Sequence, residues 1–184
     1  MDFKLLFDAL EGKLAKENLT LDLHCVGGFV LQHHGLKATD DIDAFYESSE
    51  RIDALIAEVG EEFHVGNAKE VWLNHSVDQV MAKPDFRDEE TVYQADHLIV
   101  HIISLEAVLL NKVQLGRVKD ISDIAKIMKK LDLTDPMPLI EKLMKYTEGE
   151  TDPSALLEAY AEAYGDAALE NLIKNNQELM RLLK

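Results

Sequence analysis

The chain has 184 residues, of which 47% are hydrophobic and 29% are charged, as in an ordinary globular protein that can form its own core. Its formal net charge of −16 opposes binding to the phosphate backbone of DNA, and no apolar run reaches the length that spans a bilayer. The first residues lack the basic and apolar regions of a signal peptide, so we expect a cytoplasmic protein. Cys25 is the only cysteine, which excludes an intramolecular disulfide, and its apolar surroundings predict a buried, inert thiol.

The hydrophobic pattern divides the chain into a mixed α/β portion, residues 1–103, and an all-helical portion, residues 104–184. Predicted helices span residues 2–17, 29–34, 50–59, 69–73, 104–115, 122–131, 136–146, a segment that begins at 152–153, and 167–183. Predicted strands span residues 21–26, 41–46, 62–65, 77–81, 91–94 and 98–103. Because nothing between the two portions resembles a flexible linker, we expect an α+β fold in which helices flank a mixed sheet and the C-terminal helices pack on it.

Residues 23–46 carry the side chains most typical of phosphate chemistry, in the order strand, Gly-Gly turn, helix, loop and strand. At Gly27 and Gly28 no side chain prevents the backbone N–H groups of a helix N-terminus from approaching a phosphate. Asp41 and Asp43 are two positions apart on a strand, so we expect both carboxylates on one face, where they could bind Mg²⁺. An isolated Asp-x-Asp in so acidic a chain is usually a solvated surface, but here it continues into an apolar strand. The sequence therefore predicts a nucleotide and metal site.

Gly27-Gly28 followed by Asp41-Ile42-Asp43 resembles the motif of the minimal nucleotidyltransferase fold, which is polymerase-β-like. The resemblance is greatest to a bacterial group that includes the AbiEii-like abortive-infection toxins, whose additional His-Gly and Thr match His34-Gly35 and Thr39. Residues 104–124 resemble a later motif of the same group, so the resemblance covers roughly residues 20–130. It implies a nucleotidyltransferase-like core and an enzyme that moves a nucleoside monophosphate from an NTP to a hydroxyl, with pyrophosphate as the leaving group.

The resemblance also implies roles for individual residues. Asp41 and Asp43 would hold Mg²⁺ or Mn²⁺ as catalytic carboxylates, and the nucleotide would be bound by Gly27, Gly28, Thr39, Lys112, Arg117 and Asp120. In this interpretation Lys112 meets the triphosphate, while Asp120 and Asp123 orient Lys112 or Arg117. A structural alternative is that the two carboxylates cap the next helix and pair with neighbouring cations.

Active members of the superfamily usually add a third carboxylate, which binds metal and can act as a base toward the attacking hydroxyl. The first candidate is Asp78, in a predicted strand, followed by Asp96 before the apolar strand and Asp85 in a predicted loop. The histidine spacings fit no zinc signature. Trp72 could stack on a base, with Leu73-Asn74 as part of a substrate wall, but we expect a tryptophan of the core.

Two other functions compete with catalysis. The chain could bind a nucleotide without transferring it, or its acidic helices, residues 136–184, could bind a basic protein in a toxin–antitoxin-type system. If the chain is an enzyme, its acceptor is a small molecule, a protein or RNA, and the net charge disfavours a long nucleic acid. The sequence predicts no DNA and no membrane partner, and it assigns no oligomeric state.

Overall fold

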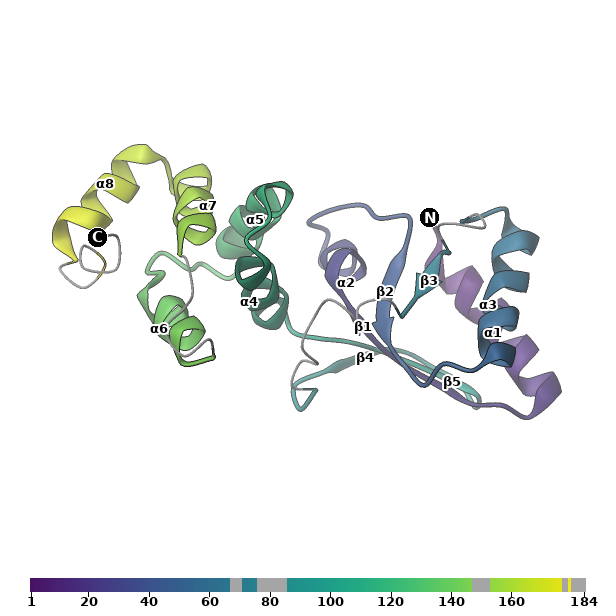
Figure 1. Cartoon of the computed structure of the whole chain (residues 1–184). Helices are drawn as coiled ribbons and strands as arrows, with labels where there is room; N and C mark the ends of the chain where they lie inside the picture. Colours follow the sequence, from purple (N-terminus) through teal and green to yellow (C-terminus); the bar gives the residue numbers. More distant parts are fainter. Residues whose placement is uncertain (67–70, 76–85, 147–152, 177–178, 180–184) are drawn as a thin grey trace. The chain divides into compact units, whose positions relative to one another are not determined.

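A computed structural model describes residues 1–66, 71–75, 86–146, 153–176 and 179, and its elements are labelled in Figure 1. The chain forms two compact units, Met1–Ser104 and Leu105–Lys184. The first contains a mixed sheet with flanking helices and the second is helical, which confirms the predicted α+β class. Across these described ranges, every helix is too short or too polar to cross a bilayer.

In the described residues of the first unit, five strands form a sheet in the order β3-β2-β1-β5-β4. The central strands β1 and β5 are parallel, whereas β2 and β4 run antiparallel to their inner neighbours. The short edge strand β3 is parallel to β2. The bounds of the strands are β1 (Leu21–Val26), β2 (Ile42–Phe45), β3 (Leu73–Asn74), β4 (Glu90–Gln94) and β5 (Leu98–Ile102).

The two faces of the sheet differ in chemistry because successive strand residues point to opposite sides. One face is apolar and buried, and its members are Leu21, Leu23, Cys25, Ile42, Ala44, Leu73, Leu98, Val100 and Ile102. The register places a second set on the opposite face, called here the polar face: Asp22, His24, Val26, Asp43, Phe45, Asn74, Thr91 and His101. The sheet therefore separates a core from a row of titratable groups.

Three helices share the core of the first unit: α1 (Phe3–Glu17), α2 (Gly27–His33) and α3 (Glu50–Phe63). Phe29 of α2 meets Phe3 and Phe7 of α1 edge-on, with ring centroids 5.1 and 5.9 Å apart. Trp72 is 1% exposed, and its indole N–H donates to the Ile56 carbonyl oxygen at 2.8 Å. Trp72 is thus a core residue, as expected, and is not positioned to stack on a base.

The strand predicted at residues 62–65 is wrong, because α3 continues to Phe63 and ends at His64 in the left-handed region, with φ 55°. The helix passes through Gly60 because this glycine serves packing: a Cβ there would lie 3.1 Å from the Trp72 indole. The helix predicted at 69–73 is also wrong at its end, where Leu73 pairs with Ile42 as a strand residue. The strand predicted at 77–81 lies outside the described residues.

The second unit begins with α4 (Leu105–Leu115), which Gly116 ends with a positive φ of 57°. The phenolic O–H of Tyr160 donates to the Thr134 carbonyl oxygen, and that of Tyr164 donates to the Met128 carbonyl oxygen, which ties α7 to α5 and the loop after it. The helix predicted at 167–183 is interrupted, because α8 ends at Asn175 and Asn176 is extended, whereas Leu179 is again helical. The remaining elements are the 3-10 helix η2 (Val118–Asp120), α5 (Ile121–Lys130), α6 (Met137–Tyr146), α7 (Ser154–Tyr164) and α8 (Asp166–Asn175).

The Cys25 thiol should be unreactive in the native protein. Cys25 is fully buried, and burial raises the pKa of its thiol well above the ordinary value, with smaller contributions from the charges of Glu89 and Asp43. We expect no reaction with Ellman's reagent at pH 8 and one equivalent of reaction in guanidinium chloride, measured by absorbance. Rapid labelling of the native protein would contradict this placement.

Candidate functional site

Gly27 and Gly28 directly follow β1 and begin α2, where a side chain would be strained at the first position and crowded at the second. Gly27 has a φ of +62°, and a Cβ there would lie 3.4 Å from Oδ2 of Asp43. A Cβ on Gly28 would lie 2.9 Å from the hydroxyl oxygen of Thr39, closer than real Cβ atoms come to their neighbours. The glycines therefore let the segment that carries Thr39 and Asp43 pack directly on the turn.

Asp43 is held beside this turn by the sheet and by one amide. It lies in β2 opposite Val26, the last residue of β1, and opposite Asn74 of β3. Its Oδ1 accepts a hydrogen bond from Nδ2 of Asn74 at 2.9 Å, and the side chain is half-buried. Asn74 therefore orients the carboxylate.

Asp41 lies one residue before β2 and is exposed. The Thr39 hydroxyl donates to Oδ1 of Asp41 at 2.7 Å, and the Thr39 backbone N–H donates to Oε1 of Gln32 in α2 at 2.8 Å. Thr39 thus connects Asp41 to α2, the helix that begins at the glycines. The structure brings five predicted residues together, called here the glycine–aspartate cluster: Gly27, Gly28, Thr39, Asp41 and Asp43.

The donors of this cluster suit a hard divalent cation. Carboxylate and hydroxyl oxygens are ligands for Mg²⁺ or Mn²⁺, and Mg²⁺ is commonly bound by one or two carboxylates together with substrate phosphates and water. Among the described residues, no group of three or more His, Cys, Asp or Glu side chains is placed to hold a metal ion. Asp41 and Asp43 therefore fit a site that the phosphates of a nucleotide would complete.

The candidates for a third carboxylate fall in different places. Asp78 and Asp85 lie outside the described residues. Asp96 is exposed between β4 and β5, near Leu98, which pairs with the first residue of β1. Asp43 pairs with the last residue of β1, about 17 Å away at 3.3 Å per residue, so Asp96 is not part of the cluster.

A different carboxylate, Glu89, reaches the polar face and was missed by the sequence analysis. Its Oε2 lies 2.7 Å from Nδ1 of His24, and its side chain is 9% exposed. Its other oxygen, Oε1, is buried with no hydrogen-bond partner among the described residues, an arrangement that typically costs about 1–3 kcal/mol. The sequence could have indicated this position, because side chains two residues apart on an extended chain point to the same side. Glu89 precedes Thr91 by two residues and therefore lies on the same side as Thr91.

The His24 ring is fixed from both sides. Its centroid lies 4.4 Å from that of Phe86 and 5.4 Å from that of His101, and both neighbours are stacked on it. Nε2 of His101 is in turn 3.1 Å from Asp22, while its Nδ1 is 3.0 Å from the Thr91 hydroxyl. The polar face therefore holds an ordered pair of histidines, each with a carboxylate partner.

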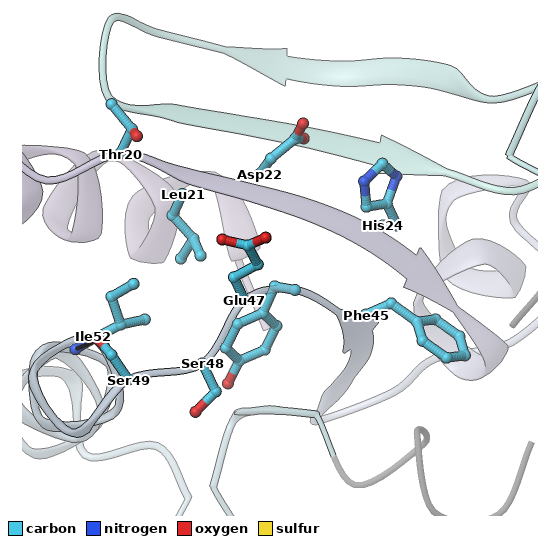
Figure 2. Close-up of a pocket in the computed structure, with 10 residues that line it drawn as sticks. Thr20, Leu21, Asp22, His24, Phe45, Glu47, Ser48, Ser49 and Ile52 are labelled. Carbon is cyan, nitrogen blue, oxygen red and sulfur yellow. Dashed lines mark hydrogen bonds between the residues drawn. The ribbon is translucent and has the colours of Figure 1, made fainter.

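A cavity of about 740 Å³ opens beside His24. Asp22 and His24 of β1 line one side, and Phe45 and Glu47 line another, with Glu47 extending toward β1 (Figure 2). Hydroxyl groups of the segment between β2 and α3 complete the lining, where Ser48 donates to Asp53 and Ser49 caps α3. The cavity has the size of a small-molecule site.

In the second unit, the residues of the later motif form a buried ionic network. Nζ of Lys112 lies 2.5 Å from Oδ1 of Asp120 and 3.0 Å from Oδ2 of Asp123, and Nε of Arg117 lies 2.6 Å from Oδ2 of Asp120. Burial alone would raise the pKa of Asp120, but hydrogen bonds from Lys112 and Arg117 outweigh it and lower the pKa. Asp120 makes no side-chain cap on α5. The ammonium group of Lys112 is thus engaged within its own unit, and the nucleotide roles of Lys112, Arg117 and Asp120 stay predictions.

A mixed sheet with a Gly-Gly turn packed against an Asp-x-Asp strand is the arrangement expected of a nucleotidyltransferase. The chain belongs to the family described as "Nucleotidyltransferase of unknown function (DUF6036)", which matches residues 2–164. No curated protein and no solved structure matches it. The match confirms the predicted nucleotidyltransferase family, whereas membership of the AbiEii-like group stays a prediction.

Gly28→Ala should disturb the cluster through Thr39. The new methyl group would overlap the Thr39 side chain, so we expect the free energy of unfolding to fall by about 1–3 kcal/mol, as for other overpacked sites. Chemical denaturation measures this loss. In a Thr39→Gly background the overlapping atoms are absent and Gly28→Ala should cost less, whereas equal costs in both backgrounds would contradict the packing.

Asp120→Asn should destabilise the protein by about 3 kcal/mol, because it removes one of the two buried carboxylates that Lys112 contacts and the buried carboxylate that Arg117 contacts. The lowered pKa of Asp120 means that its stabilisation is complete above the pKa of the unfolded chain and is lost as pH falls through the folded-state pKa. The difference in the free energy of unfolding between wild type and Asp120→Asn, measured by urea denaturation, should therefore become smaller as the pH is lowered. Exposed Asp132→Asn is the matched control, expected within about 0.5 kcal/mol of wild type.

Proposed function

We propose that this protein is a metal-dependent nucleotidyltransferase that moves a nucleoside monophosphate from an NTP to a hydroxyl acceptor. The observation that carries the proposal is Asp43 packed on the Gly27-Gly28 turn, with Asp41 tied to the same turn through Thr39. Family membership supports the reaction class. The oxygen donors of the cluster support Mg²⁺ or Mn²⁺ as the cofactor.

Each residue of the cluster would have its own role in the reaction. Asp41 and Asp43 would hold the divalent cation, which neutralises phosphate charge when bound. The backbone N–H groups at Gly27 and Gly28 would bind phosphate oxygens, and Asn74 keeps the Asp43 carboxylate in orientation. The acceptor oxygen forms a bond to the α-phosphorus while the bond from that phosphorus to the bridging oxygen breaks, and pyrophosphate leaves with the bonding electrons.

The charge of the protein bears on the acceptor. With a net charge of −16 the chain repels a long polyanion, so we propose a small molecule or a protein as the acceptor in preference to RNA. The cavity beside His24 on the polar face has room for a small molecule. The acidic character of the protein also makes a cation necessary for the anionic NTP to bind.

Asp43→Asn should abolish transfer while leaving the fold intact. Losing a ligand of the cation should lower the rate on the order of 100-fold or more, because metal stabilisation of phosphate charge is worth several kcal/mol. The measurement is radiolabel transfer from each α-³²P-NTP to acceptors in the presence of Mg²⁺ or Mn²⁺, with pyrophosphate release followed in parallel.

Asp40→Asn is the matched control, because Asp40 is the exposed neighbour of Asp41 and lies outside the cluster, so its activity should equal that of wild type. Full activity in Asp43→Asn would contradict the proposal. Binding of an NTP by the wild type without transfer or pyrophosphate release would favour a nucleotide-binding protein, the alternative supported by a cluster with two carboxylates.

A further inference from the structure

His24 and the cavity beside it lie next to the glycine–aspartate cluster on the polar face. His24 precedes Val26 by two residues on β1, and Val26 is the cross-strand partner of Asp43. His24 and Asp43 are therefore diagonal neighbours on the polar face, with a typical Cα separation of about 7–8 Å. The cavity reaches His24 and Phe45, and Phe45 follows Asp43 by two positions on the same face. A molecule at the His24 end of the cavity would therefore lie next to the cluster.

Glu89 determines which nitrogen of His24 faces a ligand as a base. An ionised carboxylate can only accept hydrogen bonds, so Nδ1 of His24 carries the proton in the 2.7 Å contact with Oε2 of Glu89. In the neutral ring the lone pair is then on Nε2. The stacked rings of Phe86 and His101 restrict rotation of the imidazole.

The fold alone does not account for the Glu89 carboxylate. The side chain is nine-tenths buried, yet Oε1 has no partner within the part of the chain that the structure describes, so the carboxylate bears a desolvation cost that one contact offsets only in part. A buried polar atom without a partner is rare in native proteins, and a catalytic role is one reason for keeping it. An imidazolium at His24 would be that charge.

We propose that the cavity beside His24 binds the hydroxyl acceptor, and that His24, positioned by Glu89, takes the proton of that hydroxyl during transfer. This inference rests on the proposed function. The acceptor O–H proton moves to Nε2 of His24 as the acceptor oxygen bonds to the α-phosphorus and pyrophosphate departs. Glu89 balances the imidazolium, which returns the proton to solvent after the product leaves. His24 is the catalytic residue and Glu89 is a positioning residue.

The lining of the cavity also selects the acceptor by charge. Asp22 and Glu47 are its charged members, and no Lys or Arg is among the described residues that line it. The acceptor is therefore a small hydroxyl-bearing molecule that is neutral or cationic. Glucosamine, glucose and glucose 6-phosphate share one ring and differ in charge, so they test this selection. We expect kcat/KM for transfer to fall in that order, and a preference for the phosphate would overturn the assignment of the cavity.

The decisive experiment measures pyrophosphate release and labelling of glycerol in His24→Ala, with and without added imidazole. We expect a loss of kcat of about 100-fold, partial recovery with imidazole, and an unchanged Kd for the NTP. His24→Gln should lose activity equally and should not be rescued, since the larger side chain fills the space. His97→Gln is the matched control, because His97 lies at the other end of the sheet, bonded to the Leu19 carbonyl oxygen.

The role of Glu89 has a readout of its own. Glu89→Gln should lower kcat about 10-fold without changing the Kd for the NTP. Its amide can accept from or donate to Nδ1, so ¹⁵N NMR of His24 should show a mixture of ring tautomers in place of the single Nδ1–H form. A single tautomer in this variant, with wild-type kcat, would overturn the positioning role.

The outcomes separate the inference from the function on which it rests. Two results would overturn the proton transfer to His24 and leave the nucleotidyltransferase proposal standing. One is a wild-type kcat in folded His24→Ala. The other is a loss of kcat that imidazole does not rescue although the variant still binds the NTP. If the wild type, like Asp43→Asn, gives no transfer and no pyrophosphate with any of the four NTPs, both proposals are overturned.

Discussion

The candidate site depends on the space left by two absent side chains. At the end of β1 the chain turns into α2 through Gly27, whose φ of +62° other residues rarely adopt, and Gly28, where Thr39 occupies the volume that a Cβ would need. Asp43 lies directly beside Gly27, 3.4 Å from the position of a Cβ. This contact brings two segments more than ten residues apart in sequence to the same point. The hydrogen bonds of Thr39 to Asp41 and to Gln32 then fix the loop on the helix. The glycines therefore serve the assembly of the carboxylates as much as the approach of a phosphate.

Successive side chains of β1 point to opposite faces of the sheet, and this places its reactive groups in different environments. Cys25 points into the core, where burial raises the pKa of its thiol, while His24 beside it points to the polar face and meets Glu89. Neighbouring residues on a strand cannot form a pair, and the structure gives His24 a partner 65 positions along the chain. The same parity places Glu89 with Asp43 on one side of the sheet. One strand thus contributes an uncharged side chain to the core and titratable side chains to the polar face.

In the second unit, the charged residues of the later motif form ion pairs with one another. Lys112 on α4 is bonded to Asp120 before α5 and to Asp123 within it, so one buried ammonium connects two helices across the Gly116 turn. The pairing of these charges within the motif was one of the two interpretations that the sequence allowed. A buried network of this kind specifies how the helices pack, because any other arrangement would leave a charge unpaired in the interior.

The sequence by itself determined the class of fold, most of the helices and strands, and the glycine–aspartate cluster, because these depend on local periodicity and on residues within one supersecondary unit. It failed at Glu62–Val65, where α3 continues to Phe63, since the contact of Gly60 with Trp72 is tertiary. Only the tertiary structure could pair His24 with Glu89 and Asp43 with Asn74, because strand order and register decide which distant residues become neighbours. The spacing of charges along the chain carries no information about that register, whereas the pleat of the sheet fixes it once the strands have paired.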